Sequence, residues 1–316
     1  MNKNKVIVIG STNVDKFLNV KRFPKPGETL HINQAQKEFG GGKGANQAIA
    51  ASRLAADTTF ISKIGKDGNA NFILEDFKKA GIHTQYILTS ESEETGQAFI
   101  TVDEAGQNTI LVYGGANMTL SATDVEMSAE AFIGADFVVA QLEVPFEAIE
   151  QAFKIARKQN ITTVLNPAPA IELPKSLLEL TDIIIPNETE AELLTGISIN
   201  NESDMKETAT YFLDLGISAV LITLGEQGTY SAYQEQYKMI PACNVKAVDT
   251  TAAGDTFIGA FLSELNKDLS NLESAIRLAN QASSLTVQRK GAQASIPTRK
   301  EVEAAVSYTH LRAHET

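Results

Sequence analysis

Short apolar runs that alternate with helical patterns constrain the fold of this chain more than any other feature. Such unbroken runs are typical of strands buried on both faces, as in a parallel sheet covered by its crossover helices. They occupy residues 6–9, 58–61, 137–142, 162–165, 183–185 and 219–222. Helical stripes lie between them, one of them closed by Gly81. The sequence therefore predicts an α/β fold, with a mainly parallel sheet and helices on both faces.

Two further stretches carry a different pattern. Residues 16–39 have no helix signal, and residues 29–32 alternate weakly like an exposed strand. Residues 97–102 and 109–113 flank a polar turn and predict a hairpin. We expect both stretches to pair as a small β-sheet lid, formed by about residues 14–40 and 96–115. Its apolar face would need covering by closure over a substrate or by a second subunit, so a homodimer through the lid is expected.

Composition narrows the class of ligand and the compartment. The chain has 316 residues, of which 43% are hydrophobic, so we expect one main domain over residues 1–306. Its net charge of −12 argues against a surface that binds nucleic acid or an anionic membrane. Cys243 is the single cysteine, which excludes an internal disulfide and fits the reducing cytoplasm. No signal peptide or membrane-spanning run is apparent.

The last ten residues do not continue the preceding apolar periodicity. They hold His310 and His314 at helical spacing, without any accompanying metal-ligand set. We interpret residues 307–316 as a non-native tail and assign them no function.

The stretch 248–257 predicts an anion-binding helix start. Small residues precede an apolar helix that should begin near Ala253, so the first helical amides are free to approach a bound anion. The small residues are Ala252, Ala253 and Gly254. Asp255 lies in the same turn, where a carboxylate needs a task such as taking a proton from an attacking hydroxyl. The alternative is that Asp249 or Asp255 only caps the helix.

Polar residues follow the first predicted strand. Asn13 and Asp15 suit hydrogen bonding to sugar hydroxyls, or alternatively a simple Asx turn. The G-x-G-x-x-G pattern of dinucleotide-binding folds is missing here, so a nicotinamide-dependent dehydrogenase loses its main support.

A glycine run at residues 40–42 precedes an alanine-rich helix, predicted over residues 48–54. Gly41 and Gly42 allow the backbone close to a ligand, and Lys43 and Asn46 can reach it. The alternative is that the glycines serve only a tight turn or hinge. The Walker A pattern is not satisfied. Further polar residues follow later strands, where ligands of such sheets gather. These are Glu143, Asn166, Asn187 with Glu190, and Thr223 with Gly225 and Gly228. Asn187 and Glu190 also read as an ordinary capping box.

Taken together, these motifs in this order resemble the ribokinase branch of the PfkB-like carbohydrate kinases, from about residue 6 to residue 297. The resemblance rests on residues 10–15, 41–47, 166–170, 186–190, 222–225, 248–255 and 289–293. It implies ATP-dependent phosphorylation of D-ribose at the C5 hydroxyl, in ribose catabolism, with ATP, Mg²⁺ and K⁺ as cofactors.

The resemblance also implies residue roles. Asp255 would be the base, and the amides of Ala252, Ala253 and Gly254 the anion hole. The ribose site would comprise Asn13, Asp15, Gly41, Gly42, Lys43, Asn46, Glu143 and Asp255. The nucleotide site would comprise Asn187, Thr223, Gly225, Gly228, Gly254 and Asn280. Glu190 would act on Mg²⁺ through water. The positions matching a K⁺ site, several through backbone carbonyls, are Asp249, Thr251, Thr286, Arg289, Gly291 and Ser295.

Two alternatives keep the same fold. A kinase for deoxyribose, another pentose or a nucleoside would retain every catalytic residue and change only the sugar wall. A non-catalytic sugar sensor would have no use for Asp255 in the anion hole, which argues against that alternative.

Overall fold

In the computed structural model, which describes residues 3–32, 37–105 and 107–313, nine strands form one large sheet. Its order is β13-β12-β11-β10-β9-β8-β1-β4-β5, parallel from β11 to β5 and antiparallel at β12 and β13. The strands are β1 (Lys5–Ile9), β4 (Asp57–Ile64), β5 (Ile87–Thr89), β8 (Phe137–Ala140), β9 (Thr162–Leu165), β10 (Ile183–Ile184), β11 (Ala219–Thr223), β12 (Gly228–Tyr233) and β13 (Gln236–Pro241). The predicted mainly parallel sheet is confirmed.

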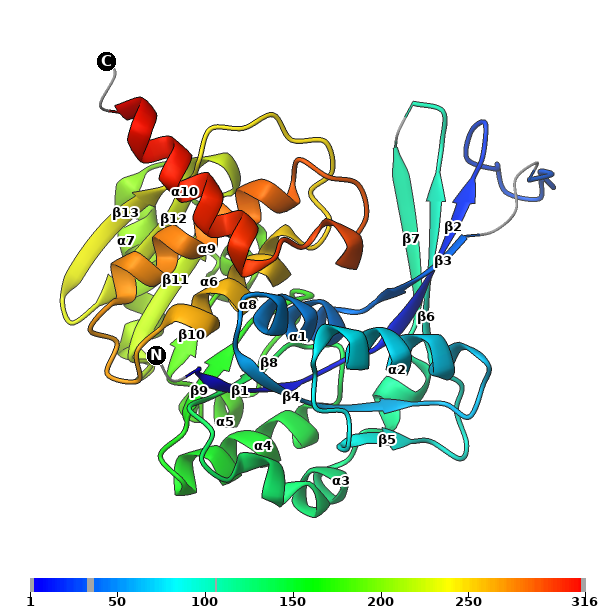
Figure 1. The fold of residues 1–316 in the computed structure, drawn as a ribbon, viewed down its shortest axis with the longest axis horizontal. Helices are drawn as coiled ribbons and strands as arrows, with labels where there is room; N and C mark the ends of the chain where they lie inside the picture. Colours follow the sequence, from blue (N-terminus) through cyan, green and yellow to red (C-terminus); the bar gives the residue numbers. More distant parts are fainter. Residues whose placement is uncertain (1–2, 33–36, 106, 314–316) are drawn as a thin grey trace.

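Helices cover both faces of this sheet, as predicted (Figure 1). One face packs against α1 (Lys43–Arg53), α2 (Asn69–Ala80), α8 (Ala253–Glu264), α9 (Leu272–Thr286) and α10 (Arg299–Ala313). The other packs against α3 (Ala122–Met127), α4 (Phe146–Lys158), α5 (Lys175–Glu179), α6 (Glu188–Thr195) and α7 (Glu202–Asp214). Successive side chains of β1 enter opposite layers, Val6 and Val8 one core and Ile7 and Ile9 the other. Burial on both faces explains why its sequence is continuously apolar.

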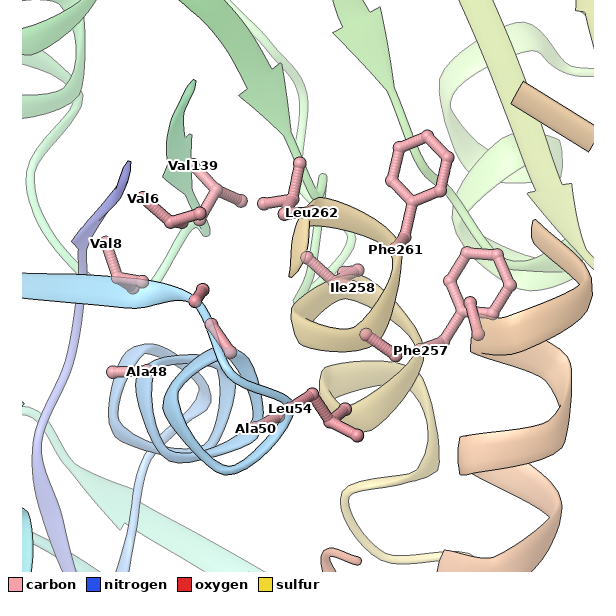
Figure 2. Close-up of a cluster of buried hydrophobic side chains, with 14 of the residues drawn as sticks. Val6, Val8, Ala48, Ala50, Leu54, Val139, Phe257, Ile258, Phe261 and Leu262 are labelled. Carbon is pink, nitrogen blue, oxygen red and sulfur yellow. The ribbon is translucent and has the colours of Figure 1, made fainter. Parts of the chain in front are cut away.

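Helices α1 and α8 lie in direct contact on one face of the sheet. Figure 2 shows α1 beside α8, with Ala48 on the side of α1 away from α8. Ala48, Ala50, Phe257, Ile258 and Phe261 belong to one core cluster. The contact is very close, because a Cβ atom built on Gly259 would lie 2.4 Å from the Cβ of Ala50. The small residues of both helices therefore bring their N-terminal ends together at the same edge of the sheet.

A separate sheet projects from the body of the molecule (Figure 1). Its strand order is β3-β2-β6-β7, from β2 (Asn13–Asn19), β3 (Lys37–Gly41), β6 (Gly96–Val102) and β7 (Asn108–Tyr113). The predicted hairpin is confirmed as the antiparallel pair of β6 and β7. The expected strand at residues 29–32 is wrong, since no strand lies there, and β2 and β3 supply the pairing instead. Residues 33–36 and 106 of the predicted lid lie outside the described residues.

Two predicted boundaries differ from the structure. The alanine-rich helix begins at Lys43 rather than at residue 48, because Gly42 supplies a positive φ of 91° at its N-cap and the helix can start directly after the glycine run. Helix α10 continues through Ala313 into the predicted tail, whose residues 314–316 lie outside the described residues. That the tail is non-native stays a prediction. Every helix within the described ranges is too short or too polar to span a lipid bilayer.

Candidate active site

The predicted sugar-binding residues meet at the edge where the parallel strands end. Asn13 and Asp15 begin β2 just after β1, and Lys43 and Asn46 lie in the first turn of α1. Glu143 follows β8. The carboxyl ends of parallel strands share one edge of a sheet, which is why residues so distant in sequence converge there.

Asp255 lies in the first turn of α8, buried against α1. Its Oδ2 accepts a hydrogen bond from Asn46 Nδ2 at 3.0 Å, and its Oδ1 accepts one from Gln47 Nε2 at 3.1 Å. Burial raises the pKa of the Asp255 carboxyl group above its ordinary value, while Lys43 and the two amide donors oppose that increase. A buried carboxylate of increased basicity, held at both oxygens, is suited to general base catalysis.

Asp15 is a second buried carboxyl group, and it interacts electrostatically with Asp255. Burial, with a smaller repulsion from Glu143 and Asp255, raises its pKa from 3.8 to about 7. Gly41 leaves it room, because a Cβ atom there would lie 2.2 Å from both Asp15 oxygens. The glycine run thus has a steric function beside the acid, in addition to starting α1.

Glu143 connects the first strand with α1. Its Oε2 accepts hydrogen bonds from Ser11 Oγ at 2.5 Å and from the Lys43 amide at 3.0 Å. Burial lowers the pKa of Lys43, but attraction to Asp255, Glu143 and another nearby carboxylate raises it overall. Lys43 is therefore the positive charge among the carboxylates of the pocket.

A cavity of about 980 Å³ lies next to Asp255, on the other side of the α8 start. All six predicted nucleotide-site residues line it: Asn187, Thr223, Gly225, Gly228, Gly254 and Asn280. The side chain of Asn280 is occupied within the protein, because it accepts a hydrogen bond from Thr229 and donates to the carbonyls of Ile240 and Pro241. Its side chain therefore shapes the wall of the cavity by joining β12, β13 and α9.

The start of α8 contributes to both regions, with Asp255 in the buried polar cluster and Gly254 at the cavity. Ala252 is its N-cap in the left-handed conformation, with φ of 60°, and Ala253 and Gly254 line the larger cavity. The Ala253 amide donates to the Thr250 carbonyl at 3.2 Å. Among the described residues, no acceptor is found for the amides of Ala252 and Gly254. These two donors at a helix N-terminus suit an anion.

The predicted K⁺ positions gather around the loop after α9. Asp249 accepts hydrogen bonds from the amide and hydroxyl of Thr251 and from the Gly291 amide. The side chains of Thr286, Arg289 and Ser295 bond elsewhere, to Thr256, Glu301 and Ala292. Any cation at these positions would therefore compete with existing hydrogen bonds of these side chains or use other oxygen donors, such as backbone carbonyls.

Glu190 completes the capping box of α6 with Asn187, as the sequence predicts. Its two carboxylate oxygens accept from the Asn187 amide and the Asn187 side chain, each at 2.9 Å. No group of three or more histidine, cysteine, aspartate or glutamate side chains that could hold a metal lies in the described part of the chain. An ion near Glu190 would therefore keep most of its water, as Mg²⁺ commonly does.

Three polar residues of the site had no role assigned from the sequence. Gln47 and Gln141 are fully buried beside Asp255, and Asn117 donates to Asn13 Oδ1 at 2.8 Å while accepting from the Thr12 amide. Gln47 lies one residue after Asn46 in the glycine-lysine motif, and Gln141 is the polar residue within the apolar run 137–142. The sequence pattern could therefore have indicated a role for both residues. Asn117 lies in a short 3₁₀ segment, Gly115–Thr119, where no local pattern indicates a role.

Comparison with known proteins places the chain among sugar kinases. Residues 3–299 match the model of the pfkB family carbohydrate kinases. Ribokinase of Staphylococcus aureus is 64% identical over 299 residues, 95% of this chain and 98% of that protein. Ribokinase of Haemophilus influenzae is 45% identical over 93% of this chain and 95% of that protein. The structure of Arabidopsis thaliana ribokinase complexed with ribose and ATP superposes with a TM-score of 0.89 at 33% identity, covering 96% of this chain and 98% of that chain.

Proposed function

The chain belongs to the PfkB family of carbohydrate kinases, and from this we propose that it transfers the γ-phosphoryl group of ATP to the C5 hydroxyl of D-ribose. The products are D-ribose 5-phosphate and ADP. The observation that carries the proposal is Asp255, a buried carboxylate that lies among polar side chains and beside a large cavity at a helix N-terminus.

The polar pocket suits a polyol. Asn46 Oδ1 is buried and has no partner among the residues that the structure describes, so a sugar hydroxyl that donates to it would remove the penalty of an unsatisfied acceptor. Asp15, Glu143 and Asn13 supply further acceptors, and Lys43 a donor. Gly41 and Gly42 allow the sugar close to the backbone, because neither carries a side chain into the pocket.

In the chemical step, Asp255 takes the proton of the C5 hydroxyl as its oxygen attacks the γ-phosphorus. The bond from the γ-phosphorus to the bridging oxygen breaks, and ADP leaves with that electron pair. Negative charge develops on the transferred group, and the amides of Ala252 and Gly254 would donate hydrogen bonds to it, whereas the Ala253 amide already bonds to the Thr250 carbonyl. The raised pKa of Asp255 makes it a stronger base than an exposed aspartate.

Cations complete the proposal. When bound, Mg²⁺ would neutralise charge on the phosphates, with Glu190 contacting its water shell and Asn187 near the phosphates. A K⁺ ion would lie against the carbonyls near Asp249, where it would support the anion hole electrostatically. The supporting observation is that Thr251 and Gly291 both bond to Asp249, which brings these positions together at one loop.

The small sheet of β2, β3, β6 and β7 is proposed as a lid over the sugar and as the surface of a homodimer. Each residue of β7 is exposed, and Leu111 and Val112 are 68% and 58% exposed. An apolar strand exposed on both faces is a liability unless a second copy covers it. A cytoplasmic location also belongs to the proposal, since ATP is the donor and Cys243 is unpaired.

An assay of ADP formation tests the function. Purified protein is given ATP and Mg²⁺, with and without K⁺, and D-ribose, deoxyribose, fructose or adenosine in parallel. We expect turnover with ribose, an increase on addition of K⁺, and a loss of at least about 1,000-fold in Asp255→Asn, which keeps the shape but cannot take the proton. Turnover that prefers deoxyribose or adenosine would establish the alternative kinase. No turnover with any sugar, alongside ribose binding, would favour the sensor.

A further inference from the structure

Gln47 joins the catalytic carboxylate to the central sheet. Its side chain is fully buried, and its Nε2 donates to Asp255 Oδ1 at 3.1 Å and to Asn166 Oδ1 at 3.1 Å. Both protons of the amide group are therefore used. Asn166 follows β9 and is itself fixed, since its Nδ2 donates to the Ile185 carbonyl at 3.0 Å.

Gln141 determines which end of the Gln47 amide faces Asp255. Gln141 follows β8, is fully buried, and donates from Nε2 to Gln47 Oε1 at 2.5 Å. Because this bond occupies the carbonyl end of Gln47, its amino end must point toward Asp255 and Asn166. Gly10 makes room for this arrangement, as a Cβ atom there would lie 2.1 Å from Gln141 Oε1.

Within the part of the chain that the structure describes, no other donor gives Asp255 equivalent support. Asn46 holds the second oxygen of Asp255, but its remaining oxygen is available to the sugar, so its orientation can respond to ligand. Gln47 has every polar atom occupied by protein. Gln47 is therefore the fixed hydrogen-bond partner of Asp255, whereas the side-chain orientation of Asn46 can change when a ligand binds.

We propose that Gln47, oriented by Gln141 and Asn166, is a positioning residue that aims the Asp255 carboxylate at the sugar hydroxyl. The inference rests on the proposed function. Gln47 acts on Asp255 rather than on substrate, and the chain of hydrogen bonds fixes the base to the ends of β8 and β9. This arrangement supplies the rigid support that a catalytic group needs on its non-reacting side.

A second consequence concerns ionisation. A donor to a carboxylate favours the charged form, so loss of the Gln47 donor raises the pKa of Asp255 further. The charged groups around Asp255 remain in place: Lys43 on α1, Asp15 on β2, Glu143 after β8 and Glu190 on α6. Replacing Gln47 by methionine leaves these charges unchanged while removing the donor.

The experiment compares Gln47→Met and Gln141→Met with Gln151→Met. Gln151 makes the same type of bond, from its Nε2 to the Glu126 carboxylate at 3.0 Å, but on the surface of α4 far from the site. Three quantities are measured: the pH profile of kcat for ribose, the dissociation constant of ribose, and the titration of Asp255. The last uses ¹³C-carboxyl NMR, with Asp255→Asn assigning the signal.

In Gln47→Met we expect the Asp255 titration and the acidic limb of kcat to move up by about one pH unit, as loss of one hydrogen bond to a charged group predicts. At pH values on the acidic limb, kcat should therefore fall about tenfold relative to wild type. Ribose affinity should stay within about twofold of wild type, because Gln47 does not line the sugar pocket. Gln141→Met should shift both profiles in the same direction by less, and Gln151→Met should shift neither.

The inference is overturned if kcat falls while the Asp255 titration and the acidic limb stay in place, or if ribose affinity falls in proportion to kcat. If Gln47→Met does not fold, Gln141→Met decides by the same criteria. If wild-type protein forms no ADP with ribose, the proposed function fails, whereas the NMR titration still tests whether Gln47 acts on Asp255.

Discussion

Replacing Asp15 by asparagine should make the unliganded protein more stable at neutral and alkaline pH. Asp15 is only 8% exposed and shares its pocket with Glu143 and Asp255. Burial and repulsion raise its pKa from 3.8 to about 7, so folding holds a proton on Asp15 that the unfolded chain has released. The charged form therefore opposes folding.

The magnitude follows from this difference in pKa. Each pKa unit corresponds to about 1.36 kcal/mol, so ionised Asp15 lowers the free energy of unfolding by roughly 4 kcal/mol above pH 7. Below pH 3.8 both states are protonated and the penalty vanishes. The stability that neutral Asp15 provides is thus complete at low pH and is lost as pH rises to about 7. Asparagine stays neutral at every pH, so Asp15→Asn should gain increasingly over wild type between these limits.

Urea unfolding of the two proteins, followed by circular dichroism at intervals from pH 4.5 to 8.5, measures the difference directly. Glu207→Gln, a charge-removing change at an exposed position of α7, is the matched control and should give a small difference without this pH dependence. A gain that is equal at pH 4.5 and 8.5, or a variant less stable than wild type at pH 8, would refute the reasoning. Ribose binding should weaken in Asp15→Asn, since an acceptor for the sugar is lost.

Three further changes test other parts of the structure. Gly259→Val should lower the free energy of unfolding by about 1–3 kcal/mol and reduce kcat, because the added atoms collide with Ala50 and separate α1 from α8. A urea unfolding curve that matches wild type would contradict the close contact. Gly228→Ala should raise the KM for ATP several-fold and change the KM for ribose little. The reason is that Gly228 has φ of 115° and a Cβ atom there would lie 2.2 Å from the Ile240 carbonyl oxygen, beside the nucleotide cavity. Equal changes in both KM values would argue against this explanation. Leu111→Lys should turn the proposed dimer into a monomer in light scattering, and a dimer that survives would remove the small sheet from the interface.

The strands and layers of the fold were predictable because burial on two faces leaves a direct mark on sequence. Every predicted buried run is a strand of the large sheet, and the capping box of Asn187 and Glu190 and the left-handed C-cap at Gly81 lie where their residues indicate. The small sheet was less predictable. Its strand β3 contains Gly40 and Gly41, which have low strand propensity, so only the pairing with β2 makes it a strand.

Site residues were predictable where they lie in a local motif, and unpredictable where tertiary packing alone brings them together. Lys43 follows a glycine run and Asp255 follows small residues, each at a helix start whose pattern indicates ligand binding. The charge interactions among Asp15, Glu143 and Asp255 depend on distances that no local sequence window contains. Asn117 supports Asn13 from 104 residues away, and nothing near Asn117 indicates this.

The contact between α1 and α8 links the fold to the chemistry. Gly259 lies four residues after Asp255 on α8, and Ala51 lies four residues after Gln47 on α1, so each offset is about one helical turn. A Cβ atom on Gly259 would lie 2.5 Å from the Ala51 amide nitrogen, so the two helices approach closely at this point. One turn before that approach, in each helix, the side chains of Gln47 and Asp255 meet at 3.1 Å. The geometry of the base thus depends on small residues that never touch substrate. A larger residue at Gly259 should therefore reduce kcat more than it weakens ribose binding, and equal losses in both would show that the helix contact supports only the fold.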